Sequence, residues 1–569
     1  MASTLLSPGV EIQERDLTVG SIETVEVNVG GIAGAFSKGP VLKPVRITSE
    51  SQLIEQFGEP TDSNAYEWWT AASFLQYGGV LDVVRVSTTG QLTASDDDVT
   101  SPYTLSIPTV EVYESTYANA ASNPFKWAAR SPGVSSNAIK VAIIDKGADV
   151  TLSLDGALST STIGTQVQTA SGSPNGAKSG FIYEWDSVNN KVSLITSDTW
   201  IATDVIENGV TDLNVTAKTE WYDGQTAFGN VSWASISPRP GTSPYVAERG
   251  GANDEMHIVV YDSTGVITGK PNTLLEKFTY VSKANDAKTS SGAVNYYPTV
   301  ILNKSQYVYW GSHENDAYDV SGNAAIASGA NFGGTGNAGN PSTTTFDLFS
   351  SDSANRSYTF VKGAETLSAT SGQIITGLNE FADTETIDID YLLMGGGDSG
   401  SKTNTQAIAA KVLSVCSGRK DAVGFISPYY GDVVGVTSSA TQTQNVVDFY
   451  SNMQATSFGV FDSGWKYIYD RFADKYRYVP LNGDVAGLCA SVTANGTPWF
   501  SPAGLNRGAI RGAVKLAFSP TKSERDTLYQ KRVNPVTSLP GQGIVLFGDK
   551  TALASPSAFD RINVRRLFN

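Results

Sequence analysis

The sequence predicts a multidomain protein that combines α/β and α+β structure, with β-rich segments inserted into the chain. Its 569 residues exceed the usual size of a single domain and leave room for about three to five. Apolar residues make up 40% of the chain, enough for sizeable cores, whereas only 17% are charged. With Gly, Ser, Thr and Asn abundant, this balance favours strands and long polar connections over helical bundles.

The chain is expected to begin with an extended arm over residues 1–20. Val10 and Ile12 alternate with polar neighbours, as in a strand, and they follow a turn signal at Ser7, Pro8 and Gly9. A compact α/β unit is predicted over residues 21–90. Its elements are a strand in ETVEVNVGGIAGAF, helices in ESQLIEQFG and EWWTAASFLQYGG, and a strand buried on both faces in VLDVVRVS.

The middle of the chain changes in character. Residues 91–235 are predicted to be an inserted, β-rich outer domain, because short alternating runs such as VTLSLDG and KVSLITSD lie among Ser, Thr, Asn and Gly. Residues 236–365 contain strand-like runs, MHIVVYD, PTVILN and QYVYWG. Together with residues 21–90 they are predicted to form a discontinuous middle α/β domain.

Residues 366–569 return to an α/β pattern. Strands are predicted in IDIDYLLM and DAVGFISP, and helices in TNTQAIAAKVLSVCSG and VVDFYSNM. Near the end, Ile562 and Val564 alternate like a strand and Leu567 starts what reads as a helix, with no stop signal after it. This domain is therefore expected to be truncated at its C-terminus.

Charge is unevenly distributed along the sequence. The net charge of −16 disfavours nucleic acid as a partner. Residues 501–569, however, carry +7 against −23 for the remainder. This asymmetry indicates a cationic surface that faces an acidic partner, such as another copy of the chain, unless it is a local fluctuation screened by solvent.

Membrane insertion and disulfide bonding are not expected. No apolar stretch approaches the length of a membrane span, and the N-terminus lacks the basic region of a signal peptide. The chain is thus expected to be soluble and made inside a cell. Cys416 and Cys489 lie in apolar contexts and are predicted to be buried free thiols.

The glycine-rich stretch from Gly395 to Thr403 offers the most plausible catalytic or nucleotide-binding motif. Gly395 and Gly400 have the spacing of a phosphate-binding loop, but Ser401 stands where the lysine must be, so a β–α connection is the preferred interpretation. The same loop contains a Gly-Asp-Ser-Gly sequence around Ser399. A serine nucleophile needs a histidine base, and His257 and His313 are the only histidines.

Three further motifs are weaker. Residues 334–339 match a dinucleotide-binding pattern by letter, but no strand precedes them. Residues 96–98 are three aspartates without calcium-loop spacing, and Asp388 and Asp390 alternate on what reads as a solvated strand face. We therefore expect no catalytic residues, no metal and no cofactor, and a structural role.

Both ends of the chain resemble tail sheath proteins of contractile-tailed phages, most closely those of T-even-like myophages and cyanophages. The N-terminal resemblance lies in LLSPGVEIQERDLT, GAFSKGPVLKPVRITSESQLIEQFG and NAYEWWTAASFLQYGGVLDVVRV. The C-terminal one lies in WKYIYDRFADKYRYVPLNGDVAGLCA, PWFSPAGLNRGAIRGAVKLAFSPTKSERDTLYQKRVNPVTSLPGQGIVLFGDKT and SAFDRINVRRLFN. These stretches occur in the family's order and spacing, and they span roughly 1–90 and 366–569.

The resemblance implies a conserved inner core built from both chain ends, with outer domains inserted one within another. It implies hexameric rings that stack around an inner tail tube and contract to drive that tube through the host envelope. Expected partners are other sheath subunits, the tube protein, and baseplate and tail terminator proteins. The protein would be assembled in the host cytoplasm and reside in the tail sheath of the virion.

The resemblance also assigns roles to particular residues. Ser7, Pro8, Gly9, Val10 and Ile12 would belong to an arm that adds a strand to a neighbouring subunit. Contacts with the tube or a neighbour are expected from a set of basic residues: Lys515, Arg525, Lys531, Arg532, Arg565 and Arg566. Two alternatives remain, the sheath of a phage-tail-like injection system and a glycan-binding tail fibre.

Overall fold

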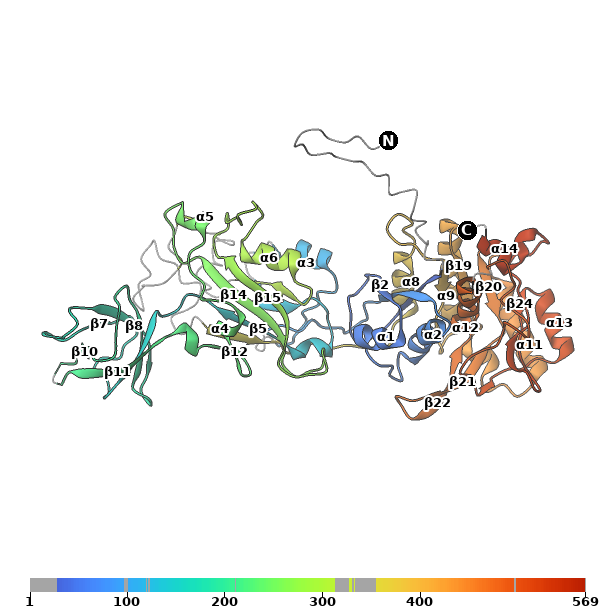
Figure 1. Cartoon of the computed structure of the whole chain (residues 1–569). Helices are drawn as coiled ribbons and strands as arrows, with labels where there is room; N and C mark the ends of the chain where they lie inside the picture. The colour runs from blue at the N-terminus through green and yellow to red at the C-terminus, as the bar shows by residue number, and fades with distance from the viewer. Residues whose placement is uncertain are drawn as a thin grey trace, which may run out of the picture. The chain divides into compact units, whose positions relative to one another are not determined.

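The chain forms two compact units, drawn in Figure 1. The computed structural model describes residues 28–96, 101–118, 120, 123–209, 211–312, 327–329, 332, 355–495 and 498–567. Of these, unit 1 takes the residues up to Phe36, Lys43–Val86 and those from Ser368 onward, and unit 2 takes Ser37–Leu42 and Ser87–Leu367. Unit 2 is thus inserted into unit 1 along the chain.

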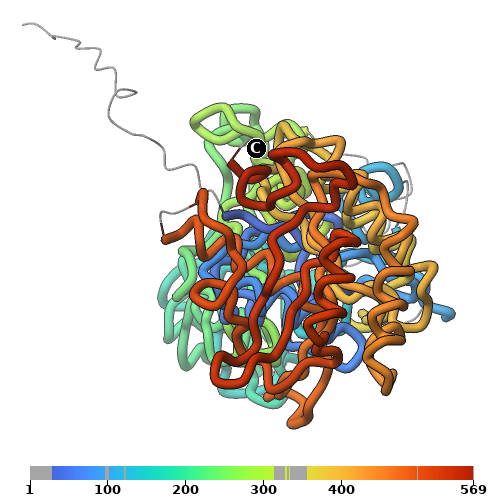
Figure 2. Tube along the Cα trace, turned by 90° about the vertical axis from the view of Figure 1, so that its right-hand side faces the viewer, coloured from blue at the N-terminus to red at the C-terminus, as the bar shows by residue number. Residues whose placement is uncertain are grey.

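Unit 1 is built on a seven-stranded sheet to which both chain ends contribute (Figures 1 and 2). Across the sheet the strands are β2 (Val45–Ile47), β3 (Val80–Arg85), β1 (Val29–Gly34), β18 (Tyr391–Leu393), β19 (Val423–Ile426), β20 (Gly459–Asp462) and β24 (Val533–Asn534). Only β2 is antiparallel to its neighbour. Gly31 of β1 pairs with Asp82 on one side and with Leu392 on the other, so segments about 300 residues apart share one ladder.

Helices cover both faces of this sheet, as expected for parallel strands that are buried on both sides. α2 (Ala65–Leu75) and α12 (Asn482–Ala494) pack on one face, and α8 (Ser371–Glu380) and α9 (Lys402–Arg419) pack on the other. Glycine allows this close approach, because a Cβ at Gly31 would lie 2.8 Å from the ring of Phe381, the residue that follows α8.

Unit 1 contains further elements around this sheet. They are α1 (Glu50–Phe57), α10 (Tyr430–Val433), α11 (Ser439–Ser451), β21 (Trp465–Asp470), β22 (Lys475–Pro480), β23 (Lys515–Leu516), α13 (Lys522–Gln530), β25 (Val536–Leu539), β26 (Gly543–Leu546), η4 (Ala558–Asp560) and α14 (Ile562–Leu567). β21 lies between β22 and β23 in a separate three-stranded sheet, and β25 pairs with β26.

Unit 2 contains two larger sheets. A four-stranded sheet has the order β15 (Thr273–Ser282), β14 (Glu255–Asp262), β5 (Ile139–Ile144) and β17 (Asn355–Thr359). A six-stranded sheet has the order β10 (Val205–Ile206), β11 (Leu213–Glu220), β6 (Val150–Leu154), β9 (Lys191–Ile195), β8 (Ser179–Asp186) and β7 (Gln166–Gln168). All neighbouring strands in both sheets are antiparallel.

Shorter elements complete unit 2. They are α3 (Val110–Thr116), β4 (Trp127–Ala129), η2 (Val134–Ala138), η3 (Tyr222–Gly224), β12 (Thr226–Phe228), β13 (Val231–Ser232), α4 (Trp233–Ile236), α5 (Pro244–Ala247), α6 (Tyr297–Lys304) and β16 (Val308–Trp310).

Residues 150–220 form a module within unit 2. Its core consists only of residues from Val150 to Val215, among them Leu152, Ile182 and Trp200. The two ends of the module meet, because Glu220 pairs with Val150 and the Trp221 amide donates to the Asp149 carbonyl at 3.5 Å. The structure therefore has one insertion within another, as the resemblance implies.

The domain boundaries predicted from the sequence need correction. Apart from Ser37–Leu42, residues 29–86 do not join residues 236–365, because β1 and β3 pair with each other and β1 with β18 of unit 1. Residues 91–235 are not a separate domain either, because β5 lies between β14 and β17 in one sheet. Composition reported the β-rich character but could not report which strands pair.

Most local predictions are confirmed, and three are wrong. The strand predicted in IDIDYLLM is limited to Tyr391–Leu393, so Asp388 and Asp390 do not share a solvated strand face. α1 begins at the Ser49 cap and ends at Gly58, which has a φ of 83°. PTVILN is a helix rather than a strand, with Pro298 in its first turn, where a missing N–H costs nothing. Ile562 and Val564 lie in the helix α14, and burial of Ile562 against unit 1 overrides their strand-like alternation.

Candidate functional site

A buried polar network joins the two chain ends inside unit 1. Tyr77, which follows α2, donates its hydroxyl to Asp484 Oδ1 at 3.0 Å, and Lys466 Nζ donates to the same oxygen at 2.9 Å. The Arg511 amide donates to the Tyr77 hydroxyl at 2.9 Å. Burial raises the pKa of Asp484 although Lys466 opposes it. This network holds the N-terminal segment to three separate C-terminal segments.

A second network lies at the carboxyl edge of the sheet. Asp462 ends β20 and accepts hydrogen bonds from Ser427 Oγ at 2.6 Å and from the Gly464 amide at 2.9 Å. Burial raises the pKa of Asp462 to about 8, with Asp484 adding to the effect and the hydrogen bonds from Ser427 and Gly464 opposing it. Asn482, at the start of α12, bonds Ser427 and the Gly395 carbonyl.

The glycine-rich loop is a β–α connection, as the sequence favoured. Ser401 caps α9, and Asp398 accepts hydrogen bonds from the Gly400 amide at 2.9 Å and from Asn404 Nδ2 at 2.7 Å. Lys402 lies 3.0 Å from Asp432. Because the chain's own carboxylates occupy both the helix N-terminus and the lysine, this loop does not have the geometry of a phosphate site.

His257, one of the two histidines considered as a catalytic base, lies in unit 2, and both of its ring nitrogens have hydrogen-bond partners. His257 accepts from the Tyr280 amide at Nδ1, 3.0 Å away, and its Nε2 lies 2.7 Å from the Pro238 carbonyl. Burial lowers the pKa of His257. Ser399 belongs to unit 1, and His313 lies outside the described residues.

The other candidate motifs give no site. Asp96 accepts from the amides of Lys126 and Trp127, whereas Asp97, Asp98 and residues 334–339 lie outside the described residues. Asp390 accepts from the Val29 amide at 3.0 Å, and burial raises its pKa to about 6. Among the described residues, no three His, Cys, Asp or Glu side chains gather as metal ligands would.

The six predicted contact residues divide into two groups. Lys515 and Lys531 are exposed, and Arg525 is half-buried with its guanidinium 3.1 Å from the Pro520 carbonyl. The other three, Arg532, Arg565 and Arg566, are half-buried and turn toward unit 1 itself. The predicted arm residues Ser7, Pro8, Gly9, Val10 and Ile12 lie outside the described residues.

The inward-turned arginines stabilise the C-terminal segment. Arg532 donates to the Ala552 carbonyl at 2.8 Å, and the guanidinium of Arg565 lies 4.4 Å from the centre of the Phe458 ring. Arg566 donates to Thr493 Oγ1. Burial by itself would lower the pKa of Arg566, but nearby Tyr391 and other groups raise it. A run of basic letters could not distinguish these internal contacts from a cationic surface.

A tyrosine-rich surface was missed by the sequence interpretation. Tyr467 and Tyr469 of β21 lie opposite Tyr478 and Tyr476 of β22, so all four project from one side of the three-stranded sheet. We call these four residues the tyrosine face. Its signal was the alternation in KYIYD and KYRYV on both sides of a turn.

Exposed apolar side chains in unit 1 are confined to its C-terminal part. Within the described residues of that unit, those that are large and exposed are Tyr469, Tyr476, Trp499, Phe500, Leu505, Val514, Phe547 and Leu567. Exposed aromatic side chains beside basic ones are typical of protein–protein contacts. The geometry therefore supports an assembly surface on unit 1. Every helix in the described ranges is too short or too polar to span a bilayer.

Comparison with known proteins agrees with the division of the chain into two units. Residues 368–552 match the family model "Phage tail sheath protein central domain", and residues 29–86 match "Tail sheath protein Gp18 domain III N-terminal region". The tail sheath protein of Enterobacteria phage T4 is 28% identical over 604 aligned residues, covering 100% of this chain and 84% of the relative. That of Vibrio phage KVP40 is 28% identical, with 100% and 85% covered.

A solved structure, the sheath tail protein from Listeria innocua, is 9% identical with a TM-score of 0.43, covering 95% of this chain and 73% of that one. Apart from Ser37–Leu42, both matched segments fall inside unit 1, and their strands β1 and β18 are hydrogen-bonded neighbours.

Proposed function

Because this chain belongs to the phage tail sheath family and is a structural subunit of a contractile tail sheath, we propose that unit 1 builds the sheath lattice and that unit 2 is carried on its outside. One observation carries this proposal. The two segments that match sheath models are separated by an insertion of 281 residues, 87–367, yet they form one sheet with one core. The insertion is compatible with that core because it leaves and re-enters unit 1 without interrupting its strands.

In this proposal, subunits form hexameric rings that stack around the inner tail tube, between a baseplate and a terminator protein. Contraction releases energy stored in the extended lattice, and the subunit itself catalyses no reaction. Rigid units joined by extended arms suit such a change, because backbone hydrogen bonds persist while the units rotate. Residues 7–14 are our proposed arm, and assembly would take place in the host cytoplasm before the virion is complete.

Two of the basic residues remain our candidates for contact with the tube. Lys531 is exposed at the end of α13, and Arg525 lies about 1.7 turns earlier on the same helix. An acidic tube surface would complement them. Arg532, Arg565 and Arg566 are better explained by their contacts within unit 1.

The test is assembly of the purified chain, with and without the tube protein from the same phage, followed by negative-stain electron microscopy. We expect striated tubes when the tube protein is present. Lys531→Glu should shorten or abolish them, whereas the matched control Lys270→Glu in unit 2 should not. A chain that stays monomeric under every condition would contradict the proposal.

A further inference from the structure

The tyrosine face is an exposed, preformed surface on unit 1. The rings pack on one another, with centroids 5.4 Å apart for Tyr467 and Tyr476 and 5.3 Å apart for Tyr469 and Tyr476. Even so, Tyr469 is 46% exposed and Tyr476 is 53% exposed. Mutual packing fixes the rings before any partner binds, which lowers the entropic cost of binding.

The opposite side of the same sheet explains why the tyrosines point outward. Lys466, Ile468 and Asp470 alternate with the tyrosines along β21 and are all buried, at 1%, 5% and 0% exposed. The sheet therefore rests on unit 1 by that side. β22, at the lower margin of unit 1 in Figure 1, is an edge strand of this sheet.

One lysine and one aspartate lie beside the tyrosine face. Lys515 of β23 pairs with Tyr467, and its ammonium lies 4.7 Å from the centre of the Tyr467 ring. Asp474, in the turn between β21 and β22, already accepts a hydrogen bond from the Tyr469 hydroxyl at 2.5 Å. Tyrosine hydroxyls and an exposed lysine together suit carboxylates.

Unit 1 presents exposed carboxylates at the other edge of its main sheet. Asp383, Glu385 and Asp388 are exposed in the turn that leads from α8 to the amino end of β18, and we call this the acidic turn. β21, which carries Tyr467 and Tyr469 of the tyrosine face, begins at Trp465, just beyond the carboxyl end of β20. Because β18 and β20 run in the same direction, the two surfaces lie at opposite edges.

The acidic turn is held in one conformation from beneath. Arg419 donates to the carbonyls of Phe381, Asp383 and Ile387, each at 2.8 Å. Hydrogen bonds from Thr386 Oγ1 and from backbone amides lower the pKa of Asp383, which keeps this carboxylate charged at neutral pH. The turn therefore presents fixed carboxylates, which complement the tyrosine hydroxyls and the neighbouring Lys515.

We propose that the tyrosine face of one subunit binds the acidic turn of a second copy of the chain. Since the two surfaces differ and lie at opposite edges, the contact is head to tail, and repeated contacts of this kind build an open helical stack when the rotation between subunits does not close a ring. This inference rests on the proposed sheath function and names the surfaces that would join successive subunits.

The experiment is disulfide trapping in the full chain. Cys416 and Cys489 are buried, so introduced cysteines report alone. The double variant Tyr476→Cys with Glu385→Cys should give a ladder of oligomers under mild oxidation, and an equimolar mixture of the two single variants should give dimers. Tyr476→Cys with Asp526→Cys is the matched control, because Asp526 is an exposed acid on α13, and it should give no ladder.

The outcomes separate this inference from the proposed function. Tubes without a ladder would overturn the inference and leave the sheath function intact, whereas a ladder without tubes would support the contact and contradict the lattice. The absence of both would contradict both.

A charge swap adds an independent check. Lys515→Glu should raise the protein concentration needed for assembly by roughly five-fold. Adding Glu385→Lys should bring that concentration most of the way back to the value of the parent protein. No restoration would count against the pairing.

Discussion

Buried ionisable residues in unit 1 make its stability depend on pH. Asp462 is 1% exposed, and burial raises its pKa to about 8, well above the value of an unfolded aspartate. Between about pH 4 and pH 8 the folded state therefore keeps this proton, whereas the unfolded state has lost it. Unit 1 is therefore expected to lose stability as pH rises through this window and to level off above it.

Asp462→Asn should remove this dependence, because asparagine is neutral. Its amide oxygen can accept from the Gly464 amide, and its Nδ2 can donate to Ser427 Oγ in place of the hydrogen bond that Asp462 accepts from Ser427. Near pH 4 we expect little difference between the two proteins. As pH rises through the window, the free energy of unfolding of the variant should increase relative to that of the parent by about 1.4 kcal/mol for each pH unit. Calorimetric unfolding at several pH values measures this. The exposed Asp388→Asn is the control, and an equal gain at every pH would refute the assignment.

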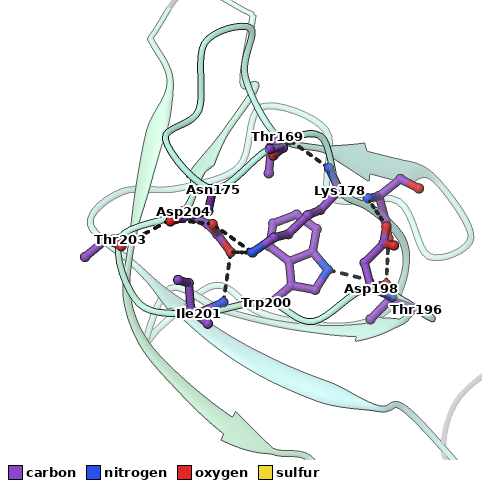
Figure 3. A network of polar contacts seen from close by, with 11 residues as sticks. Thr169, Asn175, Lys178, Thr196, Asp198, Trp200, Ile201, Thr203 and Asp204 are labelled. Carbon is purple, nitrogen blue, oxygen red and sulfur yellow. Dashed lines mark hydrogen bonds and ion pairs between the residues drawn. The ribbon is translucent and has the colours of Figure 1, made fainter.

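The module of residues 150–220 depends on a different buried pair, shown in Figure 3. Lys178 donates to both oxygens of Asp204, at 3.0 and 2.8 Å, and the side chain of Asp204 is fully buried. Asn175 and the Ile201 amide complete the set of donors to Asp204. These contacts tie the loop that precedes β8 to the segment between β9 and β10.

Lys178→Met should destabilise the module by about 3–5 kcal/mol, because it leaves the buried Asp204 without its cation. Fluorescence of Trp200, which is buried nearby, and limited proteolysis within residues 150–220 would report the loss. The double variant with Asp204→Asn should recover part of the stability, since no charge is then left unpaired. A double variant no better than the single would show that the ion pair is not the cause.

In unit 1, helices pack closely against both faces of β1. Gly30 and Gly31 point to opposite faces of β1, toward Phe74 and Phe381 respectively. Neither face has room for a Cβ, so α2 and α8 sit directly on the strand. From the sequence alone, two adjacent glycines would be expected to weaken the strand. Their role becomes clear only when the helices on both faces of the strand are known.

Gly31→Ala should cost about 1–3 kcal/mol through overpacking against Phe381. The control is Gly418→Ala in α9, where a new Cβ meets no atom within 4 Å and alanine should slightly stabilise the helix. Thermal unfolding of both variants tests this, and equal effects would show that helix packing does not constrain Gly31.

Elements with local signals were predictable, and elements decided by distant partners were not. The Ser49 cap and Gly58 defined α1 within a few residues. PTVILN and the stretch around Ile562 carry β-branched residues yet fold as helices, because burial against other segments outweighs propensity. The tyrosine face had a readable alternation, whereas the inward course of Arg532 and Arg566 depends on contacts that no spacing encodes.

At the scale of the whole chain, unit 2 is inserted into the sequence of unit 1, and the module of residues 150–220 is inserted into unit 2. This nesting explains why composition located the β-rich region but assigned residues 29–86 to the wrong partner. It also predicts that each insertion can be removed at the point where its ends meet.

Replacing residues 150–220 by two glycines between Asp149 and Trp221 should leave the rest of the chain folded, because the ends already lie together and the module has its own core. The expected result is an unchanged unfolding transition for unit 1 and unchanged assembly. Trp221 loses its contact with Tyr183, so a local change in fluorescence is expected as well. Loss of assembly would mean that the module takes part in the lattice.

The central claim, that unit 1 builds the lattice, is tested most directly by a helical reconstruction of the assembled sheath by cryo-electron microscopy. The account predicts unit 1 at low radius, with continuous density joining it to neighbouring copies, and unit 2 at high radius. Lattice contacts made chiefly by unit 2, or unit 1 facing outward, would contradict it.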